Sequence, residues 1–303
     1  MKSAKKKRGI SKSTLPFHLM LIPPLILMLI FSYIPMAGIV MAFQNYQPGM
    51  GFFKSPWVGL DNFRHIFGLS NFGQVIWNTL YIALLKIVGN IVVPITFALL
   101  LNEVQCKWFK KAVQTITYLP YFLSWVIFAG VLRDFLAPSG ALNSIITGLG
   151  GNSIYFLGNP KTFPMTMAVT DIWKNFGFNT IVYLAALTGL DPNLYEAAAV
   201  DGASRWKQTL NITLPGIAPI VALMTILAIG NILNAGFDQI FNLYSPMVYT
   251  TGDILDTFVY RLGIVDAQYS VSTAVGLFKS VISLILISSS HKIAEKYAGY
   301  QVF

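Results

Sequence analysis

Charged residues are scarce in this sequence. Only 11% of its 303 residues are Asp, Glu, Lys or Arg, whereas 55% are hydrophobic. A soluble domain carries about 25% charged residues, and even a large one leaves much of its surface in need of polar cover. The shortage of charge therefore excludes an ordinary soluble protein and indicates that lipid surrounds most of the chain.

Metal-binding and redox residues are also few, since the chain holds one cysteine, Cys106, and three histidines, His18, His65 and His291. One thiol cannot form an internal disulfide, and the spacing of these residues does not match a set of metal ligands. We expect Cys106 to be an inert residue at a helix end. The sequence predicts no metal site and no catalytic residue, because it holds no nucleophile–base or metal constellation.

The net charge of +9 raises the question of nucleic-acid binding. However, the basic residues form short clusters between apolar runs and do not follow one face of a helix. This pattern is typical of a membrane protein with basic cytoplasmic loops, and we expect no nucleic-acid partner.

Six apolar segments emerge from a window of about 19 residues. Each approaches the ~20 residues that cross about 30 Å of hydrocarbon, and each must be helical because lipid offers no hydrogen-bond partners. The first is longer than a signal-peptide core, so we expect it to stay uncleaved. The sequence predicts an all-α integral membrane protein with a basic tail at 1–14, a six-helix transmembrane domain at 15–303 and spans at about 19–43, 76–101, 116–136, 165–187, 217–233 and 271–290.

Lysine and arginine set the expected orientation. If both termini are cytoplasmic, the cytoplasmic segments hold 13 basic residues and the outer loops hold five. This asymmetry satisfies the positive-inside rule at every cytoplasmic segment. The cytoplasmic set is the six Lys and Arg of residues 1–14 together with Lys107, Lys110, Lys111, Arg205, Lys207, Lys292 and Lys296.

Four charged residues lie well inside the expected spans, namely Lys86, Asp171, Lys174 and Lys279. A charge at mid-membrane costs at least about 2.5–3.5 kcal/mol, so it should face a partner, the bundle interior or water. We expect Asp171 and Lys174 to face a pathway. For Lys86 and Lys279 the sequence leaves open an alternative, in which the ammonium reaches the headgroups by snorkelling.

Two outer loops are long. The loop at 44–75 contains a short amphipathic segment, 60–67, whose apolar side chains suit the membrane surface or the bundle. The loop at 234–270 is acidic and could either contact a partner protein or simply be solvated. Its charged residues are Asp238, Asp253, Asp256, Arg261 and Asp266.

A cytoplasmic segment between the fourth and fifth spans carries the most specific signal. Asp191 is a good N-cap and Pro192 suits the first helical position. Alanines at 197–199 favour a helix with a thin face, and Gly202 can supply the backbone angles that end it. The segment predicts a short helix at about 192–203 that another protein's groove can approach closely, although an ordinary connecting helix would look similar.

This segment resembles the EAA motif of ABC importer permeases at every fixed position. The matching residues are Glu196, Ala197, Ala198, Gly202, Ile212, Leu214 and Pro215. The chain also resembles carbohydrate-uptake permeases, especially the branch that imports oligosaccharides or polysaccharide products, over nearly its whole length. The further matches are Pro23-Pro24, Val58-Gly59-Leu60-Asp61-Asn62-Phe63, Tyr118-Leu119-Pro120 and Ala274-Val275-Gly276-Leu277-Phe278-Lys279.

The resemblance implies a type I importer in the cell membrane. Such a permease pairs with a second six-helix subunit, usually as a heterodimer, and receives sugar from an extracytoplasmic binding protein. A cytoplasmic ABC ATPase dimer drives it through the EAA helix, and the chain itself lacks a Gly-x-x-x-x-Gly-Lys-Ser/Thr loop. We therefore expect no enzyme activity and no cofactor of its own. The residues expected to couple to the ATPase are Glu196, Ala197, Ala198, Gly202 and Pro215.

Substrate contacts are predicted from side chains that suit sugars, namely aromatic faces and amides inside spans. The same residues could instead lie at membrane interfaces or bond between helices. The alternatives for function are an ABC permease for phosphate, polyamine or peptide, and an unrelated six-helix channel or membrane enzyme. The candidates for the substrate pathway are Tyr121, Trp125, Trp173, Asn175, Phe176, Asn179 and Asn231.

Overall fold

The computed structural model describes residues 15–298, with side chains described for residues 16–293. Within this part of the chain the regular structure is helical, apart from one isolated antiparallel bridge between Gln44 and Trp57. The basic tail predicted at 1–14 lies outside the described residues, and so does the side chain of Lys296. The predicted all-α class is confirmed for the described part.

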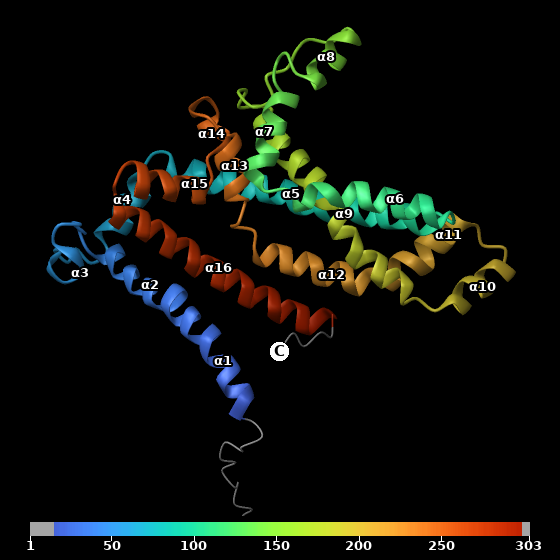
Figure 1. The fold of residues 1–303 in the computed structure, drawn as a ribbon, viewed down its shortest axis with the longest axis horizontal. Helices are drawn as coiled ribbons and strands as arrows, with labels where there is room; N and C mark the ends of the chain where they lie inside the picture. The colour runs from blue at the N-terminus through green and yellow to red at the C-terminus, as the bar shows by residue number, and fades with distance from the viewer. Residues whose placement is uncertain (1–14, 299–303) are drawn as a thin grey trace, which may run out of the picture.

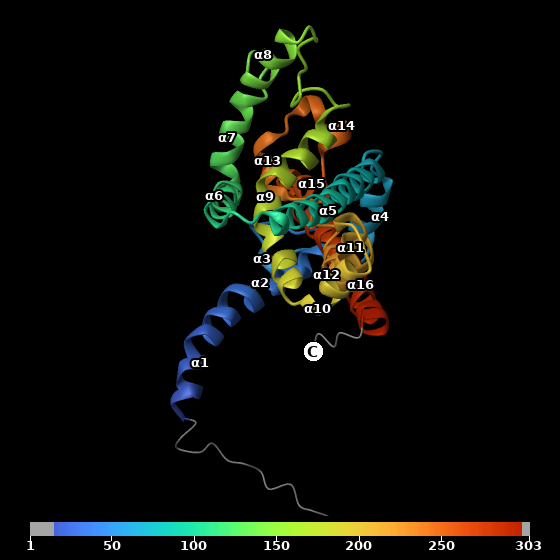
Figure 2. The same ribbon diagram turned by 90° about the vertical axis from the view of Figure 1, so that its right-hand side faces the viewer.

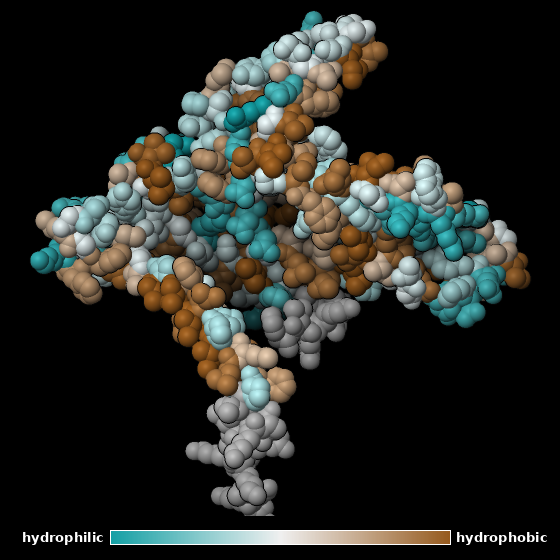
Figure 3. All heavy atoms as spheres, viewed as in Figure 1, coloured by the Kyte–Doolittle hydropathy of each residue, from teal (hydrophilic) through white to brown (hydrophobic). Residues whose placement is uncertain are grey.

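The first apolar run projects away from the other helices (Figures 1 and 2). It extends from Pro16 to Phe43, and only 6% of its most apolar window is buried. Hydrophobic side chains cover it on the face seen in Figure 3. Only its end packs firmly, where Ala42 is fully buried. The run consists of α1 (Leu15–Met28), η1 (Leu29–Tyr33), α2 (Ile34–Met36) and η2 (Ala37–Phe43).

Two long helices, α5 (Phe72–Glu103) and α9 (Phe163–Thr188), pack along each other at the centre. At Gly89 the two approach so closely that a Cβ atom there would lie 2.0 Å from Ile172 Cδ1. Ile82 of α5 and Met167 of α9 are fully buried in the core beside them. At about 1.5 Å per residue, each helix is longer than the hydrocarbon layer is thick. Their packing along each other makes them the axis of the bundle.

The third expected span is not one straight helix. The chain forms α6 (Lys107–Tyr118) and η3 (Leu119–Phe122), and then turns by 105° into α7 (Trp125–Phe135). Two local features account for the break. Pro120 cannot donate a backbone hydrogen bond, and the Ser124 side chain accepts from Ile127 N at 3.3 Å and so caps a new helix.

Four helical runs in the described part are long and apolar enough to cross a membrane, and the bent pair of α6 and α7 would add a fifth. The fourth expected span, 165–187, lies in α9, whose 26 residues are sufficient in length. Its polar side chains, among them Asp171 and Lys174, explain why α9 is less apolar than the other runs. The four apolar runs are Pro16–Phe43, Phe72–Glu103, Arg205–Gly230 and Tyr269–Ile293.

The last two long helices pack against each other. A Cβ atom at Gly230 of α12 would lie 3.4 Å from the Ile287 side chain of α16, which is ordinary van der Waals contact. A π-helical turn, η4, precedes Pro215 at the start of α12 and continues the helix into it. The bounds are α10 (Pro192–Val200), α11 (Arg205–Gln208), η4 (Thr209–Thr213), α12 (Leu214–Gly230) and α16 (Tyr269–Ala298).

The long outer loops fold into short helices. The amphipathic segment predicted at 60–67 forms a helix that lies on the bundle, because Ile66 is only 1% exposed and Phe67 meets the Phe278 ring edge-on at 5.5 Å. These helices are α3 (Gly51–Lys54), α4 (Asp61–Gly68), α8 (Ala141–Gly148), α13 (Phe237–Leu243), η5 (Pro246–Val248), α14 (Tyr249–Gly252), α15 (Leu255–Tyr260) and η6 (Arg261–Val265).

The acidic loop at 234–270 is packed and partly neutralised. Arg261 pairs with the buried carboxylate of Asp253, and Lys279 pairs with Asp256. Burial raises the pKa of Tyr244 to about 12, and the nearby Tyr249 and Asp253 add to this shift. The simple picture of a solvated acidic loop is therefore wrong for half of its aspartates.

Candidate functional site

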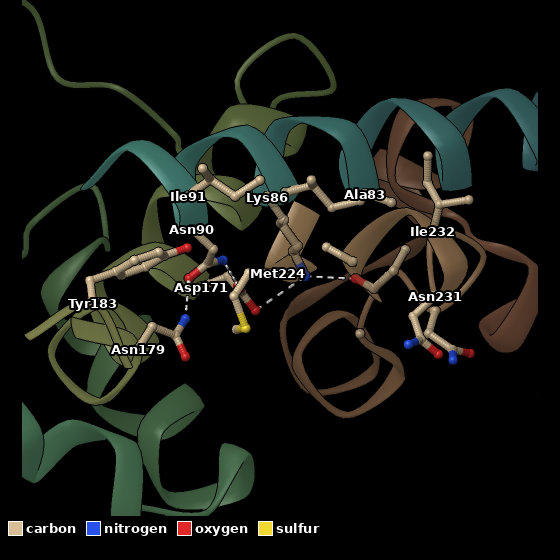
Figure 4. Close-up of a pocket in the computed structure, with 15 residues that line it drawn as sticks. Ala83, Lys86, Asn90, Ile91, Asp171, Asn179, Tyr183, Met224, Asn231 and Ile232 are labelled. Carbon is tan, nitrogen blue, oxygen red and sulfur yellow. Dashed lines mark hydrogen bonds and ion pairs between the residues drawn. The ribbon is translucent and has the colours of Figure 1, made fainter. Parts of the chain in front are cut away.

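A polar cavity of about 280 Å³ lies between α5, α9, α12 and the connection from α12 to α13 (Figure 4). Apolar side chains such as Ile87, Ile91 and Met224 form part of its wall. Four of its lining residues carry side-chain amides, and two carry opposite charges. They are Asn90, Asn179, Asn231 and Asn234, together with Lys86 and Asp171.

Lys86 and Asp171 form an ion pair inside the bundle. Lys86 Nζ lies 3.6 Å from Asp171 Oδ1, and the two side chains are 9% and 15% exposed. The ammonium also donates to the carbonyl of Ala235 at 2.6 Å and to the side-chain oxygen of Gln239. Lys86 therefore faces the interior, and the snorkelling alternative is wrong for this residue.

Two asparagines extend the ion pair into a chain of hydrogen bonds, visible as dashed lines in Figure 4. Asn90 Nδ2 donates to Asp171 Oδ2 at 2.8 Å, and Asn179 Nδ2 donates to Asn90 Oδ1 at 3.1 Å. Buried amides and charges persist only where they find such partners. The network leaves one wall of the cavity polar, so it can offer hydrogen bonds to a hydrophilic solute.

The structure brings only two of the seven predicted substrate residues to this cavity, Asn179 and Asn231. Asn231 lines it at the end of α12, to one side of the ion pair (Figure 4), and its amide donates to Leu227 O at 3.1 Å. Two further residues, Asn175 and Phe176, do not line the cavity, and Phe176 instead meets the Phe97 ring at 5.1 Å.

The other three predicted aromatic residues gather elsewhere, at the bend between η3 and α7. Tyr121 stacks on Phe178 with ring centroids 3.9 Å apart, and Trp173 lies 5.2 Å from Phe128. Lys174 donates to Tyr121 O at 2.8 Å. Its ammonium also lies 5.3 Å from the Trp125 ring. These residues stabilise the bend rather than the polar cavity.

Sequence reasoning missed Asn90 as a site residue. It lies one helical turn after Lys86, so the two side chains share a face of α5. A polar pair at this spacing within an otherwise apolar span was the signal that could have identified it. Lys279, by contrast, was singled out by the sequence, and it pairs with Asp256 and donates to Asn234 Oδ1 at 2.8 Å, so the snorkelling alternative is wrong for this residue too.

A second candidate site is α10, which contains the EAA residues. Asp191 caps this helix by accepting from Asn193 N at 3.0 Å, as the sequence predicts. Gly202 follows its end with φ +74°, and Ala203 N closes the turn on Ala198 O at 2.9 Å. Val200 is 88% exposed, although it is apolar. The helix thus presents an uncovered face at one end of the molecule (Figure 1).

A cavity of about 900 Å³ separates α10 and α11 from the end of α5. Arg205 pairs with Glu103 across it, and the Tyr195 hydroxyl lies 2.9 Å from Thr213 Oγ1. The two contacts tie the segment around α10 to the long helices α5 and α12. A displacement of α10 can therefore reach the helices that surround the polar cavity.

Comparison with known proteins identifies the family. Residues 91–297 match the family described as binding-protein-dependent transport system inner membrane component. The match covers more than half of the chain. The chain belongs to this family.

Individual relatives extend the match to nearly the whole chain. In Bacillus subtilis, the polygalacturonan/rhamnogalacturonan transport system permease protein YteP is 42% identical and covers 100% of this chain and 95% of its own. Protein LplB from the same organism is 42% identical over 92% of this chain and 88% of its own.

Solved structures also match. A crystal structure of a bacterial ABC transporter involved in the import of the acidic polysaccharide alginate aligns with TM-score 0.86 and 41% identity, covering 94% of this chain and 97% of that one. A complex of the alginate ABC transporter with alginate pentasaccharide-bound periplasmic protein aligns with TM-score 0.87 and 40% identity, covering 96% and 98% of the two chains. This permease is therefore embedded in a membrane and has the fold of an ABC importer permease.

Proposed function

We propose that the chain is the permease subunit of an ATP-driven importer that moves an oligosaccharide delivered by an extracytoplasmic binding protein. The observation that carries this proposal is the whole-chain likeness, with TM-score 0.87, to an alginate importer bound to its oligosaccharide-loaded periplasmic protein. YteP and the arabinooligosaccharide permease AraP of Bacillus subtilis add named sugar polymers and oligosaccharides. These relatives favour sugar over phosphate, polyamine or peptide.

The relatives also suggest the kind of sugar. The named substrates alginate and polygalacturonan are polymers of uronic acids, so we propose an acidic oligosaccharide as the cargo. The cavity supports a hydrophilic solute, because its amides can bond hydroxyl groups. Asn179 and Asn231 are the predicted substrate residues that line it. We propose these two as pathway contacts, whereas Tyr121, Trp125, Trp173, Asn175 and Phe176 have less support.

A second six-helix permease is the proposed neighbour of the first apolar run. From Pro16 to Met36 the side chains are exposed, and 6% of the most apolar window is buried. A helix that is apolar all round gains from packing against another protein as well as lipid. The heterodimer implied by the sequence gives this helix a surface to pack on.

The ATPase is proposed to be a separate cytoplasmic chain that docks on α10. Glu196 and Ala197 are exposed on this helix, and its end at Gly202 is open, with no atom within 4 Å of a Cβ placed there. Ala198 helps to close the terminal turn, and Pro215 begins the membrane helix that follows. In this arrangement ATP is used by the partner, both termini are cytoplasmic and the permease is multi-pass in the cell membrane.

ATPase activity of the complex purified with its binding protein tests the proposal. The sugar panel should include alginate pentasaccharide, polygalacturonate oligosaccharides and neutral oligosaccharides of equal length. We expect stimulation by an acidic oligosaccharide. Stimulation only by neutral sugars would overturn the acidic cargo, and stimulation only by phosphate, a polyamine or a peptide would overturn sugar import.

A further inference from the structure

The connection between α12 and α13, residues 231–236, is an ordered turn in the middle of the bundle. Asn234 N donates to Asn231 O at 2.8 Å, and Ala235 is only 1% exposed. Gly236 has φ +93°, a conformation that favours glycine. The connection therefore has one defined shape, and it forms part of the wall of the polar cavity.

Two lysines bind adjacent residues of this connection from different helices. Lys86 of α5 donates to the carbonyl of Ala235 at 2.6 Å, and Lys279 of α16 donates to Asn234 Oδ1 at 2.8 Å. Each lysine is paired with a carboxylate from a further element. Asp171 of α9 faces Lys86 at 3.6 Å, and Asp256 of α15 is bonded to Lys279.

The contact of Lys86 with the connection depends on glycine. A Cβ atom at Gly236 would lie 2.8 Å from Lys86 Nζ, so the ammonium can approach only because this position lacks a side chain. Gln239 strengthens the same junction, since it accepts from Lys86 and donates to Met167 O and Thr170 Oγ1 of α9, both at 2.8 Å. The helices α5 and α16 thus bond directly to the connection, and Gln239 of α13 links the same junction to α9.

The connection lies at the end of α12 remote from α10. A helix of 17 residues spans about 25 Å and transmits displacement along its axis, because its backbone hydrogen bonds resist stretching. Any movement of α10 that carries the start of α12 must therefore strain or shift residues 231–236. The two lysines are the charged groups that hold these residues to α5 and α16.

We propose that Lys86 and Lys279 are positioning residues that clamp the 231–236 connection in the resting state of the transport cycle. This inference rests on the proposed import function. Loosening the clamp would let α12 move without a signal from the binding protein. ATP hydrolysis would then proceed in the absence of sugar. Coupling between two sites typically changes an equilibrium by about 5- to 150-fold, which sets the size of the expected effect.

The experiment compares Lys86→Met, Lys279→Met, Lys279→Arg and the exposed-loop control Lys161→Met in the complete complex purified with its ATPase and partner permease. ATPase activity is measured alone and with the binding protein plus alginate pentasaccharide or polygalacturonate oligosaccharide. We expect both Met variants to raise activity in the absence of sugar by at least about fivefold and to reduce the ratio of stimulated to unstimulated activity. Lys279→Arg keeps the positive charge and should therefore retain the wild-type ratio of stimulated to unstimulated activity.

A second readout follows the connection directly. In a Cys106→Ser background, a cysteine at position 235, where Ala235 is only 1% exposed, should react faster with a water-soluble maleimide when Lys86 is Met than when it is Lys. Wild-type ATPase ratios and labelling rates in both Met variants would overturn the clamp. A parallel loss of unstimulated and sugar-stimulated ATPase activity in both Met variants and in Lys279→Arg would also overturn it, because that result indicates a purely structural role. Absence of stimulation in the wild-type complex would instead contradict the proposed function.

Discussion

Asn90 of α5 accepts a hydrogen bond from the Asn179 amide of α9 at 3.1 Å and donates one to Asp171 at 2.8 Å. One side chain therefore connects the ion pair of Lys86 and Asp171 to a proposed substrate residue. Because the amide has both a donor and an acceptor, no apolar residue of similar size can replace it.

We expect Asn90→Leu to destabilise the protein by about 1–3 kcal/mol, since it leaves polar atoms of Asp171 and Asn179 without this partner. The thermal unfolding midpoint of the detergent-solubilised complex should fall. Thr96→Val provides a control on the same helix, because the Thr96 hydroxyl bonds only to Val92 O of its own helix and is exposed. Equal midpoints for the two variants would contradict a structural role of the amide network.

The turn at Gly202 predicts a loss of coupling without a loss of folding. Gly202→Asp should abolish uptake while the protein remains in the membrane, because a charged side chain would protrude from the end of the proposed docking helix. Gly150 offers a matched control, since it also has positive φ, +86°, and open space around its Cβ position. Gly150→Asp introduces similar backbone strain far from α10. Normal uptake by the Gly202 variant would refute the assignment of this residue to coupling.

Helix crossings at two glycines should differ in tolerance. A methyl group at Gly177 would lie 2.2 Å from the backbone carbonyl oxygen of Thr117, whereas one at Gly89 would meet the end of the Ile172 side chain. A side chain can change rotamer and a helix backbone cannot easily move. Gly177→Ala should therefore cost about 1–3 kcal/mol of stability, with a smaller effect for Gly89→Ala. Unfolding midpoints of the two variants, measured side by side, test this order.

Arg261 should matter far more than Arg64, although both pair with aspartate. The side chains of Arg261 and Asp253 are 19% and 3% exposed, whereas those of Arg64 and Asp61 are 81% and 65% exposed. Arg261→Met leaves a buried carboxylate uncompensated, which costs about 3–5 kcal/mol. Arg64→Met should change stability by less than about 1 kcal/mol. Similar unfolding midpoints would show that the buried pair contributes little.

The break in the third span illustrates the limit of hydropathy. The window at 116–136 is mostly apolar, so composition alone predicts one straight helix. Pro120 and Ser124 carry the local signal for a break, but the 105° turn depends on the contacts around it. Tyr121 packs on Phe178, and Lys174 donates to the Tyr121 carbonyl. Those partners belong to α9, which lies outside 116–136 in the sequence.

The sequence by itself determined the membrane environment, the helical class and the EAA segment. Each of these follows from composition or from a pattern within about 20 residues, such as an apolar run that must be helical in lipid. The partners of Lys86 and Lys279 were decided only by tertiary structure. Asp171 is 85 residues from Lys86 in the chain, and Ala235 is 149 residues away. Packing of α5, α9, α12 and α16 brings these groups together, because a buried charge must find its partners wherever the fold places them.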